Sequence, residues 1–310
     1  MNRRRFLQIT AIGSLSTLPK AGALASVSLP SRSLVQWRGV ALGAAATIAI
    51  RHENATSLLE QVRKEIARLE GIFSLYKEDS ALSQLNRMGY LENPPLELVA
   101  LLSMCDELHE ITKGAFDPTV QPLWSLYARR YAAGNIPSKS EIITAREAVG
   151  WQHVAFSTEM IKFLRSGSAL TLNGIAQGYI ADKSATLLRN AGITDVLIDV
   201  GEIVAVGTGP DGSAWPVEIA KTDDHFRNKR IPLTDSAIAT SSPHGTVFDS
   251  SGAIGHIFDA ETGHPGGQWR QVSVIARSAA RADGLSTAFC LMDEKAIQEA
   301  SNNIEVMLTK

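Results

Sequence analysis

Two oxygen-bearing side chains, Asp283 and Thr287, stand four residues apart in the stretch AARADGLSTAFCLM (residues 279–292). We expect this stretch to begin a helix, and residues four apart lie on the same face of a helix. A carboxylate and a hydroxyl on one face are a candidate metal-binding pair. The alternative is that Asp283 caps the start of the helix, which the spacing taken alone favours.

A tyrosine and an aspartate mark two further segments in the first half of the chain. Tyr76 lies in FSLYKEDSALSQLN (73–86), where it ends an expected helix beside a polar loop. Its ring can stack there on a flat ligand or pack into the core. Asp117 precedes a proline in GAFDPTVQPLW (114–124), and this pair is typical of a turn.

Two glycines and a histidine mark segments of the second half. Gly174 and Gly178 bracket a predicted helix start in LTLNGIAQGYIAD (170–182). Glycine lets the backbone approach a ligand closely and helix N-termini favour phosphate, although an ordinary strand-to-helix turn would use the same residues. His256, in GHIFDAETGHPG (255–266), is a candidate general base because histidine titrates near neutral pH. A single histidine beside apolar neighbours is more often structural.

Taken together and in this order, the segments resemble the ApbE family, the FAD:protein FMN transferases. The resemblance runs from about residue 35 to the end of the chain. Several departures from the family pattern look like its NosX-like subgroup, which is encoded with the nitrous oxide reductase system. The motifs that carry the resemblance are YKEDSALSQLN, GAFDPTVQPL, LNGIAQGYIAD, ATSS, HIFDAETG and ADGLSTAF.

The resemblance implies a magnesium site and a catalytic base. Asp283 and Thr287 match the side-chain ligands of the family's magnesium ion, and Gly174 matches the residue that supplies a backbone carbonyl. An oxygen-only ligand set suits Mg²⁺. His256 matches the histidine proposed to help deprotonate the acceptor hydroxyl.

The resemblance also implies which residues contact the flavin. Tyr76 matches the tyrosine that stacks on the isoalloxazine ring. Around the dinucleotide, Thr171 replaces an acid of the family pattern and Gln177 replaces a lysine, so we expect flavin affinity or turnover to differ from the main family. Glu202 lies in a loop that commonly reads G-G-D but here reads Gly-Glu-Ile. The remaining implied flavin contacts are Leu42, Ala115, Phe116, Asp117 and Ile257.

The implied activity is Mg²⁺-dependent transfer of FMN from FAD to a threonine hydroxyl of a partner flavoprotein, with release of AMP. Such a transfer depends on positioning and charge neutralisation more than on covalent help from the enzyme. The NosX-like features imply a membrane-bound flavoprotein of nitrous oxide respiration as the acceptor. Two alternatives stay open, namely hydrolysis of FAD to FMN and AMP, and a non-catalytic flavin carrier or assembly factor.

The first 25 residues are expected to be a signal peptide. The run RRRFL fits the twin-arginine pattern R-R-x-F-L, a mild apolar segment follows, and ALA at residues 23–25 is a small-residue cleavage pattern. This predicts export by the twin-arginine machinery to the periplasm, with an ordinary Sec signal as the alternative. Residues 26–38 are expected to be a tether, and residues 39–310 one ApbE-like domain.

Charge argues against non-specific nucleic-acid binding. The signal peptide contains four of the 30 basic residues and no acid, so the rest of the chain has 26 basic and 32 acidic residues, a formal net charge of −6. Cys105 and Cys290 both lie in apolar helical patterns. The sequence does not decide between buried free thiols and a disulfide.

The pattern of elements predicts an α+β fold with mixed, largely antiparallel sheets and packed helices. We expect a strand over 40–50, helices over 56–73 and 95–112 with a loop between them, and a surface connection over 129–140. Residues 169–207 predict a strand, a turn, a helix and two short strands. Three later β-rich segments, WPVEIAK, QVSVIAR and IEVMLTK, predict further strands.

Overall fold

The computed structural model describes residues 10–11, 34–209, 211–219, 229–302 and 304–310. The predicted signal peptide, apart from Thr10 and Ala11, and the first part of the predicted tether lie outside the described residues, so these predictions stay untested. The tether prediction is wrong at its end, because the sheet already begins at Leu34.

Eight α-helices are present in the described part of the chain. They are α1 Ala55–Phe73, α2 Ala81–Met88, α3 Leu96–Ile111, α4 Gln121–Ala132, α5 Lys139–Glu147, α6 Ala176–Asn190, α7 Ala279–Phe289 and α8 Glu294–Ser301, with two short 3-10 turns at Pro118–Val120 and Trp151–His153. Within these described residues, no helix is long and apolar enough to cross a membrane.

In the described part of the chain, the strands form three sheets in which every neighbouring pair is antiparallel. The large sheet has the order β13-β12-β11-β8-β7-β3-β2, and the small sheets have the orders β1-β9-β10 and β4-β6-β5. This confirms the predicted α+β class. The strands are β1 Thr10–Ala11, β2 Leu34–Ala41, β3 Ala44–Arg51, β4 Tyr90–Glu92, β5 Val154–Phe156, β6 Met160–Phe163, β7 Val196–Asp199, β8 Ile203–Val206, β9 Trp215–Ile219, β10 Lys229–Leu233, β11 Ser236–Ser241, β12 Gln271–Ala276 and β13 Glu305–Thr309.

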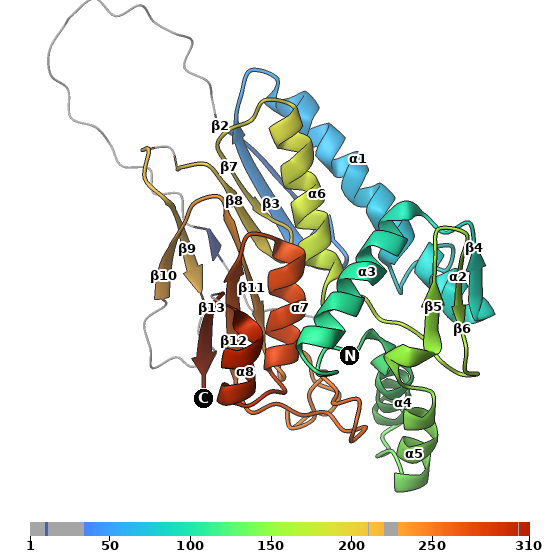
Figure 1. Cartoon of the computed structure of the whole chain (residues 1–310). Coiled ribbons are helices and arrows are strands. Elements are labelled where there is room, and N and C mark those ends of the chain that lie inside the picture. Colours follow the sequence, from blue (N-terminus) through green and yellow to red (C-terminus); the bar gives the residue numbers. More distant parts are fainter. Residues whose placement is uncertain (1–9, 12–33, 210, 220–228, 303) are drawn as a thin grey trace, which may run out of the picture.

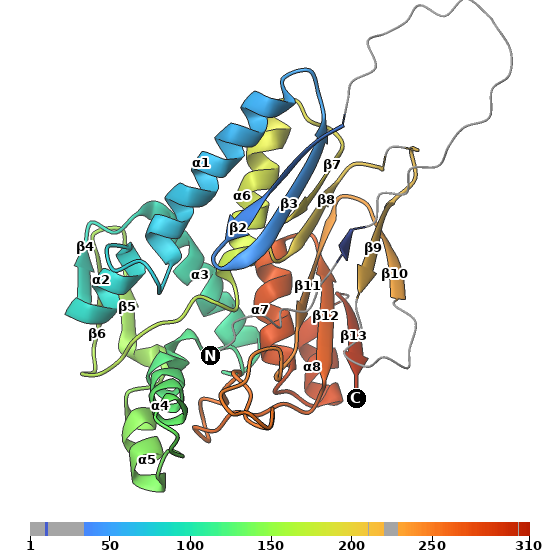
Figure 2. The same ribbon diagram turned by 180° about the vertical axis from the view of Figure 1, so that it is seen from behind.

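The central strands of the large sheet, β7, β8 and β11, are largely buried on both faces. Helices α1, α6 and α7 cover one face, and strands β9 and β10 pack on the other (Figures 1 and 2). Side chains alternate along a strand, so in β7 Ile198 joins the core under the helices while Leu197 joins the second core under β9 and β10. A central strand packed in this way is a rigid support for the groups at its ends.

The helix predicted over 56–73 is confirmed as α1. Its apolar residues recur at helical spacing, and all of them are buried in the main core. These residues are Leu58, Val62, Ile66, Leu69 and Phe73. The predicted helix over 95–112 is likewise confirmed as α3.

Other local predictions were wrong. The single strand expected over 40–50 is a hairpin, with β2 and β3 joined at Leu42 and Gly43, which both have positive φ angles of 46° and 85°. The loop expected after α1 contains α2, whose N-terminus is capped by Ser80 Oγ accepting the N–H of Ser83 at 3.0 Å. Residues 169–172 form no strand. Cys105 and Cys290 are both buried free thiols.

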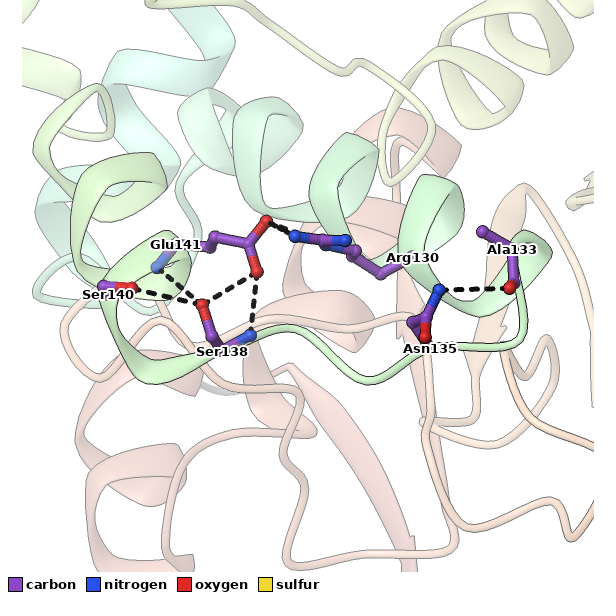
Figure 3. A network of polar contacts seen from close by, with 6 residues as sticks. All are labelled: Arg130, Ala133, Asn135, Ser138, Ser140 and Glu141. Carbon is purple, nitrogen blue, oxygen red and sulfur yellow. Dashed lines mark hydrogen bonds and ion pairs between the residues drawn. The ribbon is translucent and has the colours of Figure 1, made fainter.

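Helices α4 and α5 form a hairpin that extends away from the sheet (Figure 1). The predicted surface connection over 129–140 is therefore shorter than expected, because α4 continues to Ala132. Ser138 and Glu141 form a capping box at the start of α5, and Arg130 of α4 pairs with Glu141 (Figure 3). This network fixes the turn between the two helices.

Candidate active site

A cavity of about 310 Å³ lies where the start of α6, the middle of α7 and the β7–β8 turn meet residues 115–118 and the loop after β11. These segments are far apart in the sequence. Ten of the twelve predicted site residues line the cavity. They are Ala115, Phe116, Asp117, Thr171, Gly174, Gln177, His256, Ile257, Asp283 and Thr287.

Close packing of α6 on α7 fixes the relative position of the cavity-lining residues of these two helices. A Cβ on Gly178 would lie 2.3 Å from the carbonyl oxygen of Ala279, so only glycine allows this approach of the two backbones. Asp182 of α6 also accepts hydrogen bonds from the N–H groups of Ala279 and Ala280, at 2.9 and 3.0 Å, and from the hydroxyl of Ser278 at 2.8 Å. The first turn of α7 is therefore fixed to α6.

Asp283 does not cap the helix, so that alternative was wrong. Helix α7 begins at Ala279 and its N-cap is Ser278. The Asp283 side chain is 3% exposed, and its Oδ2 accepts the backbone N–H of Gly178 at 3.1 Å. Burial raises the pKa of Asp283 to about 7; the hydrogen bond from Gly178 opposes this shift, and the charge of Asp182 adds to it.

Gly174 lies against the side chain of Thr287. A Cβ on Gly174 would lie only 2.9 Å from Oγ1 of Thr287. The Thr287 hydroxyl also lies 3.3 Å from the hydroxyl of Ser241 at the end of β11. Because Asp283 is one helical turn before Thr287, the structure brings all three predicted ligand residues to one wall of the cavity.

Two acidic residues next to this wall had no predicted ligand role. Burial raises the pKa of Asp199 to about 6, opposed by a hydrogen bond from Gly201. Glu202 is 6% exposed, and its Oε2 has no hydrogen-bond partner. Burial, followed by the charge of Asp283, raises the pKa of Glu202 well above its ordinary value. Neither lysine nor arginine is found among the described residues that line the cavity.

These residues fit a hard divalent cation. Buried carboxylates without counter-charge are costly, and carboxylate, hydroxyl and carbonyl oxygens are the ligands that Mg²⁺ prefers. Over the described ranges, no three side chains of His, Cys, Asp or Glu are placed to share one ion. A cation here would therefore also use the Thr287 hydroxyl and the Gly174 carbonyl, which is the predicted set.

Asp117 both forms a turn and lines the cavity. Its Oδ1 accepts the backbone N–H of Thr119 at 2.8 Å and the hydroxyl of Thr119 at 2.5 Å. Burial raises the pKa of Asp117, and the hydrogen bonds from Thr119 oppose the shift. The turn hypothesis and the binding hypothesis are therefore compatible.

His256 is placed as a neutral base. Its Nδ1 lies 3.1 and 3.2 Å from the carbonyl oxygens of Thr246 and Pro243, and 3.3 Å from the N–H of Thr246. The two shorter contacts favour a proton on Nδ1, which leaves the lone pair on Nε2. Burial lowers the pKa of His256, so the neutral ring is favoured at pH 7.

Leu42 and Tyr76 do not line the cavity. Tyr76 is 65% exposed. Near the end of α1, Glu70 accepts the N–H of Leu42 at 2.7 Å and pairs with Lys77, the residue after Tyr76, at 3.0 Å. Ala45, three residues after Leu42, is part of the cavity wall. Flavin contact by Leu42 and Tyr76 stays a prediction.

Sequence reasoning missed Trp124 and gave no role to Thr240 and Ser241, all of which line the cavity. A signal was present for each of them. Trp124 ends the stretch GAFDPTVQPLW, and the other two lie within the ATSS motif. Gln177 lines the cavity, and it packs so closely on Gly201 that a Cβ on Gly201 would lie 2.7 Å from Nε2 of Gln177.

The fold and the site define an α+β protein with a cavity whose walls are rich in acidic and hydroxyl oxygens. The model of the ApbE family matches residues 42–308, and the chain belongs to this family. The chain is similar to the FAD:protein FMN transferase of Haemophilus influenzae, with 29% identity over 283 residues that cover 85% of this chain and 79% of the relative. The enzyme of the same name from Vibrio cholerae is 29% identical over 267 residues, covering 82% of this chain and 77% of the relative.

Solved structures of the family have the same fold. The apo form of the Pseudomonas stutzeri flavinyl transferase ApbE superposes with a TM-score of 0.77 at 26% identity, covering 90% of this chain and 95% of that one. The ApbE protein of Thermotoga maritima superposes with a TM-score of 0.79 at 25% identity, covering 89% and 94%.

Proposed function

We propose that the protein is an FAD:protein FMN transferase that uses Mg²⁺ to transfer FMN from FAD to a threonine hydroxyl of a partner protein. One observation carries the proposal: a single cavity brings together Asp117, Gly174, His256, Asp283 and Thr287 from four distant segments. Membership of the ApbE family, whose relatives bear that enzyme name, supports the same activity.

The cavity wall that contains Asp283 and Thr287 would hold the cation, and the cation would bind the pyrophosphate of FAD. Asp283, Thr287 and the carbonyl of Gly174 are the residues that would hold it. When bound, Mg²⁺ would neutralise charge on the pyrophosphate oxygens during the transfer. The described cavity wall contains no lysine or arginine, so the cation held by these oxygen ligands would be the positive charge that binds the doubly charged pyrophosphate.

His256 would act on the acceptor. The threonine Oγ attacks the phosphorus atom on the FMN side, a new P–O bond forms, the pyrophosphate P–O bond breaks, and AMP leaves. Nε2 of His256 takes the hydroxyl proton, because Nδ1 is directed at two backbone carbonyls. The fixed ring and its lowered pKa keep it in the basic form at neutral pH.

The place of action and the acceptor are part of the proposal. The run RRRFL and the cleavage pattern at 23–25 support twin-arginine export to the periplasm. That route carries folded proteins, so FAD loaded before export would remain bound. The NosX-like departures support a membrane-bound flavoprotein of nitrous oxide respiration as the acceptor.

The activity is tested by incubating the chain without residues 1–25 with FAD, Mg²⁺ and a threonine-bearing acceptor fragment. We expect the acceptor to gain the mass of one FMN unit, AMP to appear in equal amount, and both to vanish in EDTA. AMP and free FMN without acceptor labelling would instead identify a pyrophosphatase. Bound FAD without AMP would identify a carrier.

A further inference from the structure

One buried oxygen of the cavity has no role in the reaction above, namely Oε2 of Glu202. Glu202 lies at the turn between β7 and β8, and its side chain is more than nine-tenths buried. One carboxylate oxygen lies within reach of the backbone N–H of Thr240, but Oε2 has no hydrogen-bond partner. A buried polar atom without a partner costs free energy, so its presence on a cavity wall points to a ligand that satisfies it.

The surroundings indicate a cationic ligand. Asp283 and Asp199 both lie close enough for their charges to act on Glu202, and all three residues line the cavity. A hydrogen-bond donor would satisfy Oε2 but would leave the repulsion between neighbouring carboxylates. A divalent cation between Glu202 and Asp283 removes both costs, and carboxylate oxygen is a ligand that Mg²⁺ prefers.

We propose that Oε2 of Glu202 is a further ligand of the divalent cation held by Asp283, Thr287 and the carbonyl of Gly174. The inference rests on the proposed function and extends its metal site. Two carboxylates then neutralise the charge of the ion without any help from the ligand phosphates. Cation binding then does not require FAD, and it is measurable in the absence of flavin.

The test uses Mn²⁺ as a probe and the chain without residues 1–25 in the absence of FAD. Electron paramagnetic resonance of free Mn²⁺ gives the dissociation constant, and competition with Mg²⁺ shows that both ions share the site. We expect Glu202→Gln to weaken Mn²⁺ binding by at least about tenfold, a loss seen even when an outer partner of a metal ligand is removed.

Asp199→Asn is the matched control. It removes one charge from the same wall, and its amide oxygen still accepts the N–H of Gly201. We expect a much smaller loss of Mn²⁺ affinity than for Glu202→Gln. Equal losses in the two variants would mean that Glu202 acts only through its charge, which overturns its role as a ligand.

The remaining outcomes separate this inference from the proposed function. If the unsubstituted protein binds Mn²⁺ and Glu202→Gln binds it equally well, only the role of Glu202 is overturned. If the unsubstituted protein binds no Mn²⁺, the proposed metal site fails as well. Thermal unfolding in EDTA checks that each variant is folded. Should Glu202→Gln not fold, Glu202→Asp replaces it, with weaker Mn²⁺ binding expected and unchanged binding overturning the inference.

Discussion

The backbone N–H of Gly178 in α6 donates a 3.1 Å hydrogen bond to Oδ2 of Asp283 in α7. The bond forms because the two helices touch without an intervening side chain, since a Cβ on Gly178 would lie 2.3 Å from the carbonyl oxygen of Ala279. One contact therefore both packs the helices and fixes the direction of the carboxylate. The architecture of the core and the geometry of the candidate metal site depend on the same residue.

Gly178→Ala is expected to destabilise the fold and to weaken Mn²⁺ binding. The added methyl group meets backbone, which cannot move aside cheaply, and overpacking of this kind costs about 1–3 kcal/mol. Urea unfolding measures the loss. Gly71→Ala in α1 is the control, because its added Cβ would have no described atom within 4 Å apart from its chain neighbours and the backbone of its own helix. Helix propensity predicts that this control gains up to about 1 kcal/mol, and equal effects of the two substitutions would contradict the packing argument.

The rate of FMN transfer is expected to depend on the hydroxyl group of Thr287 and not only on the volume of its side chain. Thr287→Val keeps the volume and removes the oxygen, so we expect FMN transfer to fall by about 10- to 100-fold. Thr287→Ser keeps the oxygen that faces Gly174 and Ser241 and is expected to retain most of the activity. The measurement is the initial rate of AMP release. Similar rates for the valine and serine variants would show that the hydroxyl is not a ligand.

Asp199 is expected to make the stability of the metal-free protein depend on pH. Its pKa in the folded state is about 6, above the ordinary value of 3.8, so the proton is bound more tightly in the folded state. The stabilisation is complete below pH 3.8 and is lost as the pH rises through 6. Asp199→Asn does not lose this stabilisation as the pH rises. Its free energy of unfolding should therefore equal that of the unsubstituted protein near pH 4 and exceed it by up to about 3 kcal/mol at pH 7. Urea unfolding in EDTA at several pH values measures the difference, and a constant difference would contradict the assignment.

Ser138→Ala is expected to loosen the α4–α5 hairpin without affecting FMN transfer. Ser138 Oγ accepts the N–H of Glu141 at 3.3 Å, and the N–H of Ser138 donates to Oε2 of Glu141 at 3.0 Å (Figure 3). Loss of an N-cap hydroxyl costs about 1 kcal/mol. Hydrogen exchange of the α5 amides should quicken accordingly, with the rate of AMP release unchanged. Unchanged exchange would show that the Ser138 cap does not contribute to the stability of the hairpin.

Helices with a clear apolar period were predictable, and structure fixed by distant contacts was not. The spacing of Leu58, Val62 and Ile66 suffices for α1 because it matches one face of a helix. The hairpin turn at Leu42 was missed, since its flanks are Ala-rich and carry no turn residue before Gly43. The start of α7 depends on Asp182, nearly 100 residues earlier in the chain.

The same limit applies to the site. The ordered motifs identified ten of the residues that line the cavity, because each motif brings its own local turn or helix. The sequence showed Glu202 only as a departure from the family's G-G-D pattern in the loop after β7. Its burial follows from the pairing of β8 with β11, which brings Thr240 beside it, and neither the pairing nor the unpaired oxygen is visible in the sequence.

The central claim is that residues of the cavity wall formed by α6 and α7 bind the metal ion on which the transfer of FMN depends. The most direct test measures AMP release and acceptor mass for Asp283→Asn beside Glu294→Gln, which removes the same charge from the exposed first turn of α8. We predict that Asp283→Asn loses both AMP release and FMN labelling in saturating FAD and Mg²⁺, while Glu294→Gln keeps both. A folded Asp283→Asn protein that labels the acceptor at the unsubstituted rate would contradict the account.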